Sequence, residues 1–139
     1  MKVLVAMDGS AHGLRALDYV LSKPQMFAAA ELVLMHVALP LPPRAAAAVG
    51  AEVVAAQHAH EHEEAMRAAR QRLADSGLRA REVLEVGMPG PALAAEAERG
   101  GYDLVVMGSH GHGAALGLLL GSTVSKVLAA SRVPLLVVR

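Results

Sequence analysis

Short apolar runs alternate with longer helix-forming stretches along the whole chain. A continuous apolar run occupies residues 3–7, mostly apolar runs cover 31–37, 102–107 and 135–139, and a weaker alternation covers 79–86. Short runs of this kind, rich in β-branched and long aliphatic residues, are typical of strands in a parallel sheet. The pattern therefore predicts five strands.

Helix-forming stretches fill most of the intervals between these strands. An apolar stripe after the first strand predicts a helix that either Asp8 or Ser10 can cap. Good helix formers predict a long helix over residues 51–76, and shorter helices are predicted over 91–98 and 125–130. Strands that alternate with helices in this way predict an α/β fold, a parallel sheet with helices on both faces.

One segment breaks the alternation between the second strand and the long helix. Prolines in residues 38–44 disfavour helix and favour an extended or irregular backbone, and residues 45–48 are all alanine. We expect an irregular connection here.

Composition narrows the function classes further. The 139 residues suit one domain, and a 54% hydrophobic content can form a core. The formal net charge is +0 and aromatic residues make up only 2%, which argues against a nucleic-acid partner. The chain has no cysteine, and its N-terminal apolar run is too short for a signal peptide or a membrane span. We expect a soluble cytoplasmic protein.

The most informative stretch is the glycine-rich loop between the fourth strand and the last helix. It begins at Gly108 and runs to Gly121 and Ser122. A strand–loop–helix order places backbone N–H groups of a helix N-terminus beside the loop, where they attract anions such as phosphate. Glycine suits such a loop because it has no Cβ and adopts positive φ readily.

The glycine spacing discriminates between known phosphate loops. A Walker A loop would need lysine and serine or threonine where Ala114 and Ala115 stand, and a dinucleotide fingerprint would need glycine at Leu116. The spacing that fits is Gly108-x2-Gly111-x9-Gly121-Ser122. It resembles the nucleotide-binding signature of the universal stress protein family, in its ATP-binding branch. The alternative interpretation is a glycine-rich turn that binds nothing.

The resemblance extends over nearly the whole chain, residues 1–139. It includes Val-Ala-Met-Asp-Gly-Ser at 5–10, His-Val at 36–37, the segment 102–108 and the ending 133–138. The family implies a Rossmann-like (adenine nucleotide alpha hydrolase-like) domain whose five-stranded parallel sheet has the order 3-2-1-4-5. It also implies ATP in a cleft at the carboxyl ends of strands one and four, and homodimers paired through the last strand, Val133–Val138.

The resemblance also assigns roles by position. Asp8 would contact the adenosine, Val37 would present its backbone to the adenine, and Met107 and Gly108 would border the ribose. Gly111, His112 and Gly121 would line the phosphate path, where Ser122 and Thr123 would donate hydrogen bonds. The complete candidate set is Asp8, Gly9, Ser10, Val37, Met107, Gly108, Ser109, His110, Gly111, His112, Gly113, Gly121, Ser122, Thr123 and Val124.

One departure from the family concerns charge. Family members often carry basic residues between the second and third signature glycines, but residues 112–120 contain no lysine or arginine. Phosphate charge would then be met by backbone amides, the helix dipole, His110 or His112, and Mg²⁺.

Three functional hypotheses follow. The leading one is a regulatory nucleotide-binding protein without catalytic residues, since the sequence offers no transfer lysine, arginine finger or paired carboxylates. The second is a slow ATPase or nucleotidyl transferase that uses Asp8 and a loop histidine. The third is a structural dimer that binds no nucleotide.

The remaining histidines receive structural interpretations. His36 lies inside a strand and is expected to be packed and hydrogen-bonded. His58, His60 and His62 lie among glutamates on the long helix. Although His58 and His62 are spaced to share a metal ion, we interpret them as part of a solvated helix face.

Overall fold

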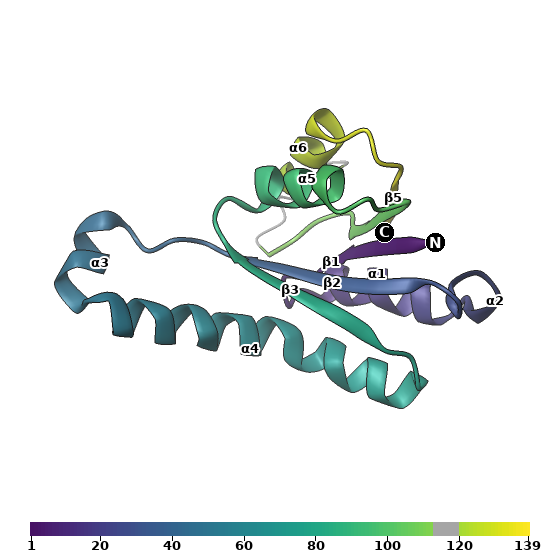
Figure 1. Cartoon of the computed structure of the whole chain (residues 1–139), viewed down its shortest axis with the longest axis horizontal. Coiled ribbons are helices and arrows are strands. Elements are labelled where there is room, and N and C mark those ends of the chain that lie inside the picture. Colours follow the sequence, from purple (N-terminus) through teal and green to yellow (C-terminus); the bar gives the residue numbers. More distant parts are fainter. Residues whose placement is uncertain (113–119) are drawn as a thin grey trace.

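The computed structural model describes residues 1–112 and 120–139, and five strands in these ranges form one sheet. All neighbouring strands pair in parallel, in the order β3-β2-β1-β4-β5 (Figure 1). The strands are β1 (Lys2–Ala6), β2 (Glu31–Ala38), β3 (Ala80–Val86), β4 (Leu104–Gly108) and β5 (Leu135–Val138). The predicted fold class and strand order are confirmed.

Helices cover both faces of this sheet. The helices of the described ranges are α1 (Ala11–Leu21), α2 (Pro24–Phe27), α3 (Pro43–Val49), α4 (Ala51–Ser76), α5 (Pro89–Arg99) and α6 (Ser122–Ala130). α1 and α4 lie on one face, and α5 and α6 lie on the other (Figure 1). None of the helices in the described part of the chain is long and apolar enough to cross a membrane.

Two helical segments differ from the sequence prediction, and two helices begin earlier than expected. Residues 39–42 are irregular as predicted, but the irregular connection predicted for 43–49 is wrong because these residues form α3. Pro43 occupies the first turn of α3, where its missing N–H costs nothing, and the alanines that follow are the strongest helix formers. The short α2 was not predicted. α5 begins two residues earlier than predicted, at Pro89, and α6 begins three residues earlier, at Ser122.

Alternate residues of the central strands face two separate cores. On one face, side chains of α1 and α4 pack on Val3, Val5 and Leu34. On the other face, side chains of α5 and α6 pack on Leu4 and Val105. Each large apolar side chain that is fully buried contributes about 1.5–3 kcal/mol. The two cores therefore fix the sheet rigidly between its helices and hold the carboxyl ends of its strands in place.

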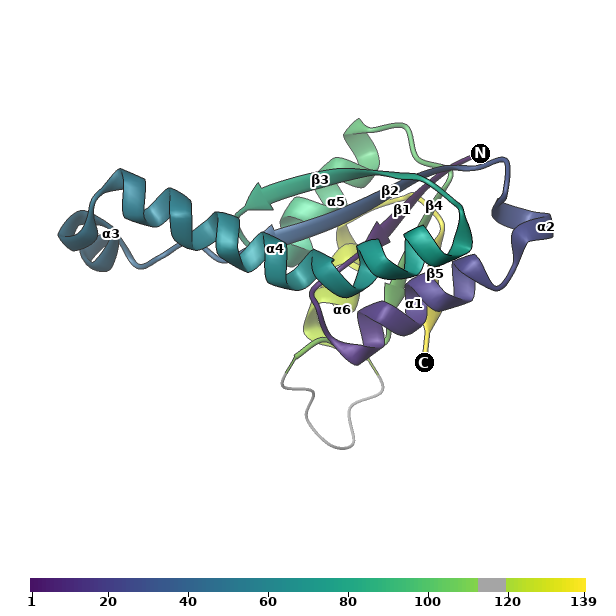
Figure 2. The same cartoon turned by 90° about the horizontal axis from the view of Figure 1, so that it is seen from below.

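One part of the molecule lies outside these cores. α3 and the first turns of α4 extend beyond the sheet, as both views show (Figures 1 and 2). No residue of α3 is buried, and the first buried residue of α4 is His62. We call residues 43–57 the projecting arm. From His62 onward, α4 packs against the sheet.

Candidate functional site

A cavity lies at the carboxyl ends of the central strands. β1 pairs with β2 on one side and with β4 on the other. Strands β2 and β3 are added on one side of β1 and strands β4 and β5 on the other, so the strand order reverses at this point. Open α/β sheets bind ligands at such a switch point. The cavity has a volume of about 960 Å³. The residues that line it are Ala6, Met7, Asp8, Gly9, Gly13, Met35, His36, Val37, Ala38, Leu39, His60, Glu61, Glu64, Ala65, Pro89, Leu93, Met107, Gly108, His110, Gly111, His112, Gly121, Ser122, Thr123 and Val124.

This cavity brings together the candidate residues of the sequence analysis with three exceptions. Ser10 and Ser109 are buried, and neither lines the cavity. Gly113 lies outside the described residues.

The turn after β1 shows which of the two cap candidates, Asp8 or Ser10, caps α1. Ser10 is the N-cap of α1, and its hydroxyl oxygen accepts a hydrogen bond from the Gly13 amide at 3.1 Å. Asp8 lines the cavity, and its Oδ1 accepts a hydrogen bond from the Ser10 amide at 2.9 Å. Gly9 between them has φ +76°, which a residue with a side chain rarely adopts. Ser10 therefore caps the helix, and Asp8 provides a carboxylate to the site.

The signature glycines are required by close packing. A Cβ on Gly111 would lie 2.7 Å from Oδ2 of Asp8, and one on Gly108 would lie 2.4 Å from the carbonyl carbon of His12. A Cβ on Gly121 would lie 3.2 Å from the Cα of His110. None of these three glycines has positive φ. The prediction that positive φ explains this motif is therefore wrong. A Cβ on Gly108 would overlap backbone atoms, and one on Gly111 or Gly121 would force neighbouring atoms to shift.

Backbone hydrogen bonds hold the ends of the glycine-rich loop. The Gly121 amide donates to the carbonyl of Ser109 at 2.7 Å, and the Ser109 amide donates to the carbonyl of Val138 at 2.8 Å. On the opposite side, the Nε2 of His112 lies 2.8 Å from the carbonyl oxygen of Asp8. That carbonyl can only accept, so His112 donates. The ring of His112 thus links the loop to the turn after β1.

The first turn of α6 faces the cavity. Ser122, Thr123 and Val124 line it, and the N-cap position is Gly121, which offers no side chain to the first amides of the helix. Helix N-termini with uncapped amides carry a partial positive charge and bind anions. The arrangement at this end of the cavity therefore suits phosphate.

The other end of the cavity is formed by β2 and α4. Val37, His36 and Leu39 of the β2 end line it together with Glu61 and Glu64 of α4. The sequence analysis placed one carboxylate, Asp8, at the site, but three carboxylates line the cavity. The residues of α4 are distant in sequence from every recognised motif, so no local pattern indicated their position.

A pair of buried histidines joins this end of the cavity to α4. The Nδ1 atoms of His36 and His62 lie 2.6 Å apart, so one ring donates a hydrogen bond to the other. Burial lowers the pKa of both imidazoles. The neighbouring ring of His62 lowers the pKa of His36 further, and the neighbouring ring of His58 lowers the pKa of His62 further. Both rings are therefore held neutral near neutral pH.

The packed interpretation of His36 is confirmed, but the solvated interpretation is wrong for His62. His62 lies on the same face of α4 as Ala65, Met66 and Ala69, all of which are buried. The spacing of three and four residues was a signal that this histidine faces the sheet. Within the described ranges, no three acidic or histidine side chains are arranged to hold a metal ion.

Comparison with known proteins gives a consistent result. The model of the universal stress protein family matches residues 1–139. The chain is 30% identical to universal stress protein YxiE of Bacillus subtilis, over 99% of this chain and 98% of that protein. It is also 37% identical to universal stress protein MJ0577 of Methanocaldococcus jannaschii over 67 residues, which are 48% of this chain and 41% of that protein.

Solved structures match over almost the full length. The structure of MJ0577 has a TM-score of 0.79 at 31% identity and covers 99% of this chain and 94% of that one. A universal stress protein solved in complex with cAMP has a TM-score of 0.71 at 25% identity, over 100% of this chain and 97% of that one.

Proposed function

This chain belongs to the universal stress protein family, and from that premise we propose that it is a regulatory protein that binds ATP in the cavity described above. The observation that carries the proposal is the position of the α6 N-terminus, whose N-cap residue is a glycine, at one end of a cavity of about 960 Å³. That volume is within the usual range for small-molecule sites. The similar protein solved with cAMP supports an adenine nucleotide as the ligand class.

The two ends of the cavity suggest an orientation for the nucleotide. Phosphates would lie against the amides of Ser122 and Thr123, with Gly111 and His112 beside them. The nucleoside would extend past Met107 and Asp8 toward the backbone of Val37. This orientation agrees with the positions that the family resemblance assigns.

Mg²⁺ is part of the proposal because the cavity lacks other cations. Among its described lining residues there is no lysine or arginine, so a triphosphate would need a divalent ion to reduce its charge. The same lack of cationic side chains favours a regulatory role over rapid phosphoryl transfer, which normally uses lysine, arginine and metal together.

Homodimerisation through β5 completes the proposal, for a protein that acts in the cytoplasm. β5 is the last strand in the sheet order, and its residues are partly exposed and apolar. Sheet edges of this kind are normally covered or paired. Sedimentation at micromolar concentration should give about twice the 14.4 kDa chain mass. A monomer throughout that range would contradict the dimer.

Mass spectrometry of freshly purified protein tests the ligand. The expected result is co-purifying ATP or, after its removal, saturable binding of Mg²⁺-ATP by titration calorimetry. Absence of binding by any adenine nucleotide to folded protein would refute the proposed function. Release of phosphate over many turnovers would instead favour the enzymatic hypothesis.

A further inference from the structure

The side chains that line the cavity are unbalanced in charge. Asp8, Glu61 and Glu64 contribute carboxylates, and none of the described lining residues is a lysine or arginine. Residues 113–119 contain no charged side chain in the sequence. At neutral pH the walls of the cavity are therefore acidic, although the ligand class proposed for it is anionic.

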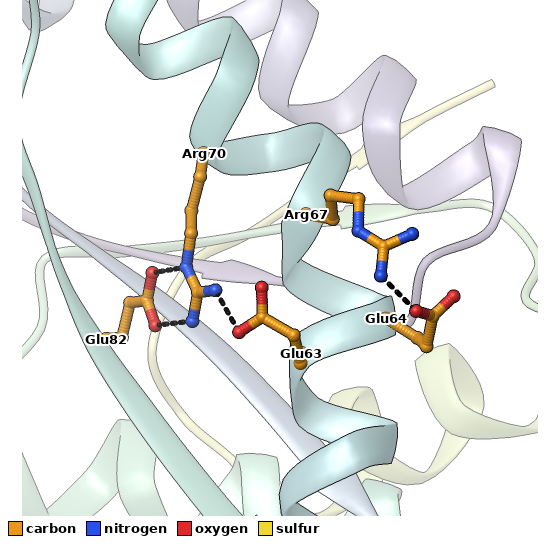
Figure 3. Close-up of polar contacts among 5 residues, drawn as sticks. All are labelled: Glu63, Glu64, Arg67, Arg70 and Glu82. Atoms are coloured by element: carbon orange, nitrogen blue, oxygen red, sulfur yellow. Dashed lines mark hydrogen bonds and ion pairs between the residues drawn. The ribbon is translucent and has the colours of Figure 1, made fainter.

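Two of the three carboxylates come from α4 and are only lightly compensated. Glu61 accepts a hydrogen bond from the neutral side chain of Gln57 at 3.1 Å. Glu64 pairs with Arg67 (Figure 3), but 66% of the Arg67 side chain and 48% of the Glu64 side chain are exposed. Solvent therefore weakens this ion pair. The α4 wall of the cavity keeps most of its negative charge.

We propose that Glu61 and Glu64 act as an electrostatic filter, which lowers the affinity of the cavity for metal-free polyphosphate nucleotides and leaves nucleosides and Mg²⁺-bound nucleotides favoured. The inference rests on the proposed function and names the charge state of the ligand for that site. Two carboxylates repel every ionised phosphate oxygen in the cavity, and the repulsion grows with the number of charges on the ligand. A neutral nucleoside is not repelled. Mg²⁺ removes most of the repulsion by neutralising phosphate charge.

α4 also supplies a matched control. Glu63 lies beside Glu64 in sequence but does not line the cavity. Its carboxylate pairs with Arg70, which also holds Glu82 of β3 through two hydrogen bonds of 2.7 and 2.8 Å (Figure 3). Figure 3 shows Glu63 directed toward Arg70 and Glu64 toward Arg67. Replacing Glu63 therefore removes one carboxylate from the same helix without altering the cavity wall, and it matches each single variant, Glu61→Gln or Glu64→Gln.

The test measures three ligands in two conditions. Titration calorimetry would compare adenosine, AMP and ATP, each with excess Mg²⁺ and with EDTA, on the parent, on Glu61→Gln/Glu64→Gln and on Glu63→Gln. Glutamine keeps the size of each side chain and its ability to accept a hydrogen bond. We expect the double variant to bind metal-free ATP about five- to tenfold more tightly than the parent, with a smaller gain for AMP.

The same experiment contains the results that would overturn the filter. Adenosine affinity should be unchanged in the double variant, and Glu63→Gln should change metal-free ATP affinity less than about twofold because its carboxylate is paired with Arg70 and does not line the cavity. Equal ATP affinity in parent and double variant would overturn the filter while the proposed function stands. Weaker adenosine binding in the double variant would also overturn it, by making these residues nucleoside contacts. If no ligand binds any variant, the proposed function itself fails.

If the double variant did not fold by circular dichroism, the single variants Glu61→Gln and Glu64→Gln would be measured in its place. Each should show part of the gain for metal-free ATP. No gain in either folded variant would overturn the filter.

Discussion

The two ends of the cavity differ in how they are built. The proposed phosphate end is made from one continuous stretch, in which β4, the glycine-rich loop and α6 follow one another in sequence. The proposed nucleoside end joins the end of β2 to the middle of α4, where His36 and His62, 26 residues apart in the sequence, meet.

This difference decides which residues a sequence motif can reveal. At the proposed phosphate end, the signature glycines lie in one stretch of sequence, although the atoms that confine them include distant ones such as Oδ2 of Asp8 against Gly111. A fixed spacing in the sequence records such constraints. At the nucleoside end, α4 is held by its packing on the sheet, and the residues it turns toward the cavity follow no motif. Changes at the phosphate end should therefore have the larger effects on binding.

The largest effect should come from Gly121→Val. Its Cβ would begin 3.2 Å from the Cα of His110 and 3.3 Å from the carbonyl oxygen of Ser109, so these atoms must shift slightly and the larger valine side chain crowds the approach to the α6 amides. Loss of two charge-assisted hydrogen bonds at about 1.5–3 kcal/mol each should weaken Mg²⁺-ATP binding about 100-fold or more. Calorimetry measures the affinity, and circular dichroism checks that the fold survives.

A graded companion is Ser122→Ala, which keeps the backbone amide and removes only the hydroxyl. It should cost about 1–2 kcal/mol, or roughly tenfold in affinity. If folded Gly121→Val bound ATP as the parent does, phosphate would not lie on this helix N-terminus.

A smaller effect is expected for Gly111→Ala, which tests the contact between the loop and Asp8. A Cβ 2.7 Å from Oδ2 must displace the carboxylate, and we expect ATP affinity to fall about tenfold, the equivalent of one good hydrogen bond. Gly87→Ala is the control, because a Cβ there meets no atom within 4 Å and its φ is not positive. Equal affinities in the two variants would show that the position of Asp8 does not matter for binding.

At the nucleoside end, the histidine pair predicts a pH effect on stability. Burial lowers the pKa of His36 and His62 from 6.5 in the folded protein, so below that pH the unfolded chain binds more protons than the folded chain. The stabilisation is present above about pH 6.5 and is lost as pH falls toward the lower folded pKa values. Nearby Asp8 and Glu61 oppose the shift of His36 only in part.

Denaturant titrations at several pH values would measure how the free energy of unfolding depends on pH. His62→Gln keeps a hydrogen-bond partner for His36 but does not titrate, so the loss of unfolding free energy between about pH 7.5 and about pH 5 should be smaller than in the parent. Replacement of the exposed His60 by glutamine should leave the parent profile unchanged. Identical profiles for parent and His62→Gln would contradict the role of the pair.

The smallest expected effect concerns metal. We predict that Zn²⁺ does not shift the melting temperature of the parent or of a variant with glutamine at His58, His60 and His62. The triple replacement should change the stability itself, because it removes the buried ring of His62 that contacts His36. A Zn²⁺-dependent shift in the parent that disappears in the variant would show that these histidines do bind metal.

Much of the fold could be predicted from the sequence because it depends on short-range patterns. Apolar runs marked all five strands, and α4 begins and ends where its composition predicted, with Gly77 at φ +72° after its last residue. The helix at residues 43–49 was not predicted because the prolines were given more weight than the alanines that follow them. At the site, the loop residues were found by spacing, while Glu61, Glu64 and the contact of His62 depended on where α4 crosses the sheet.

The projecting arm has a consequence for how the molecule opens in solution. α3 buries no residue, and Gly50, with φ +86°, joins it to α4 where an added Cβ would meet no atom within 4 Å. Elements without buried contacts open locally, at a cost well below the free energy of global unfolding. In native-state hydrogen exchange, amides of residues 43–57 should therefore exchange early and with little dependence on denaturant. Amides of α4 beyond His62 should exchange only when the sheet unfolds, so the two parts of α4 would report two different unfolding events.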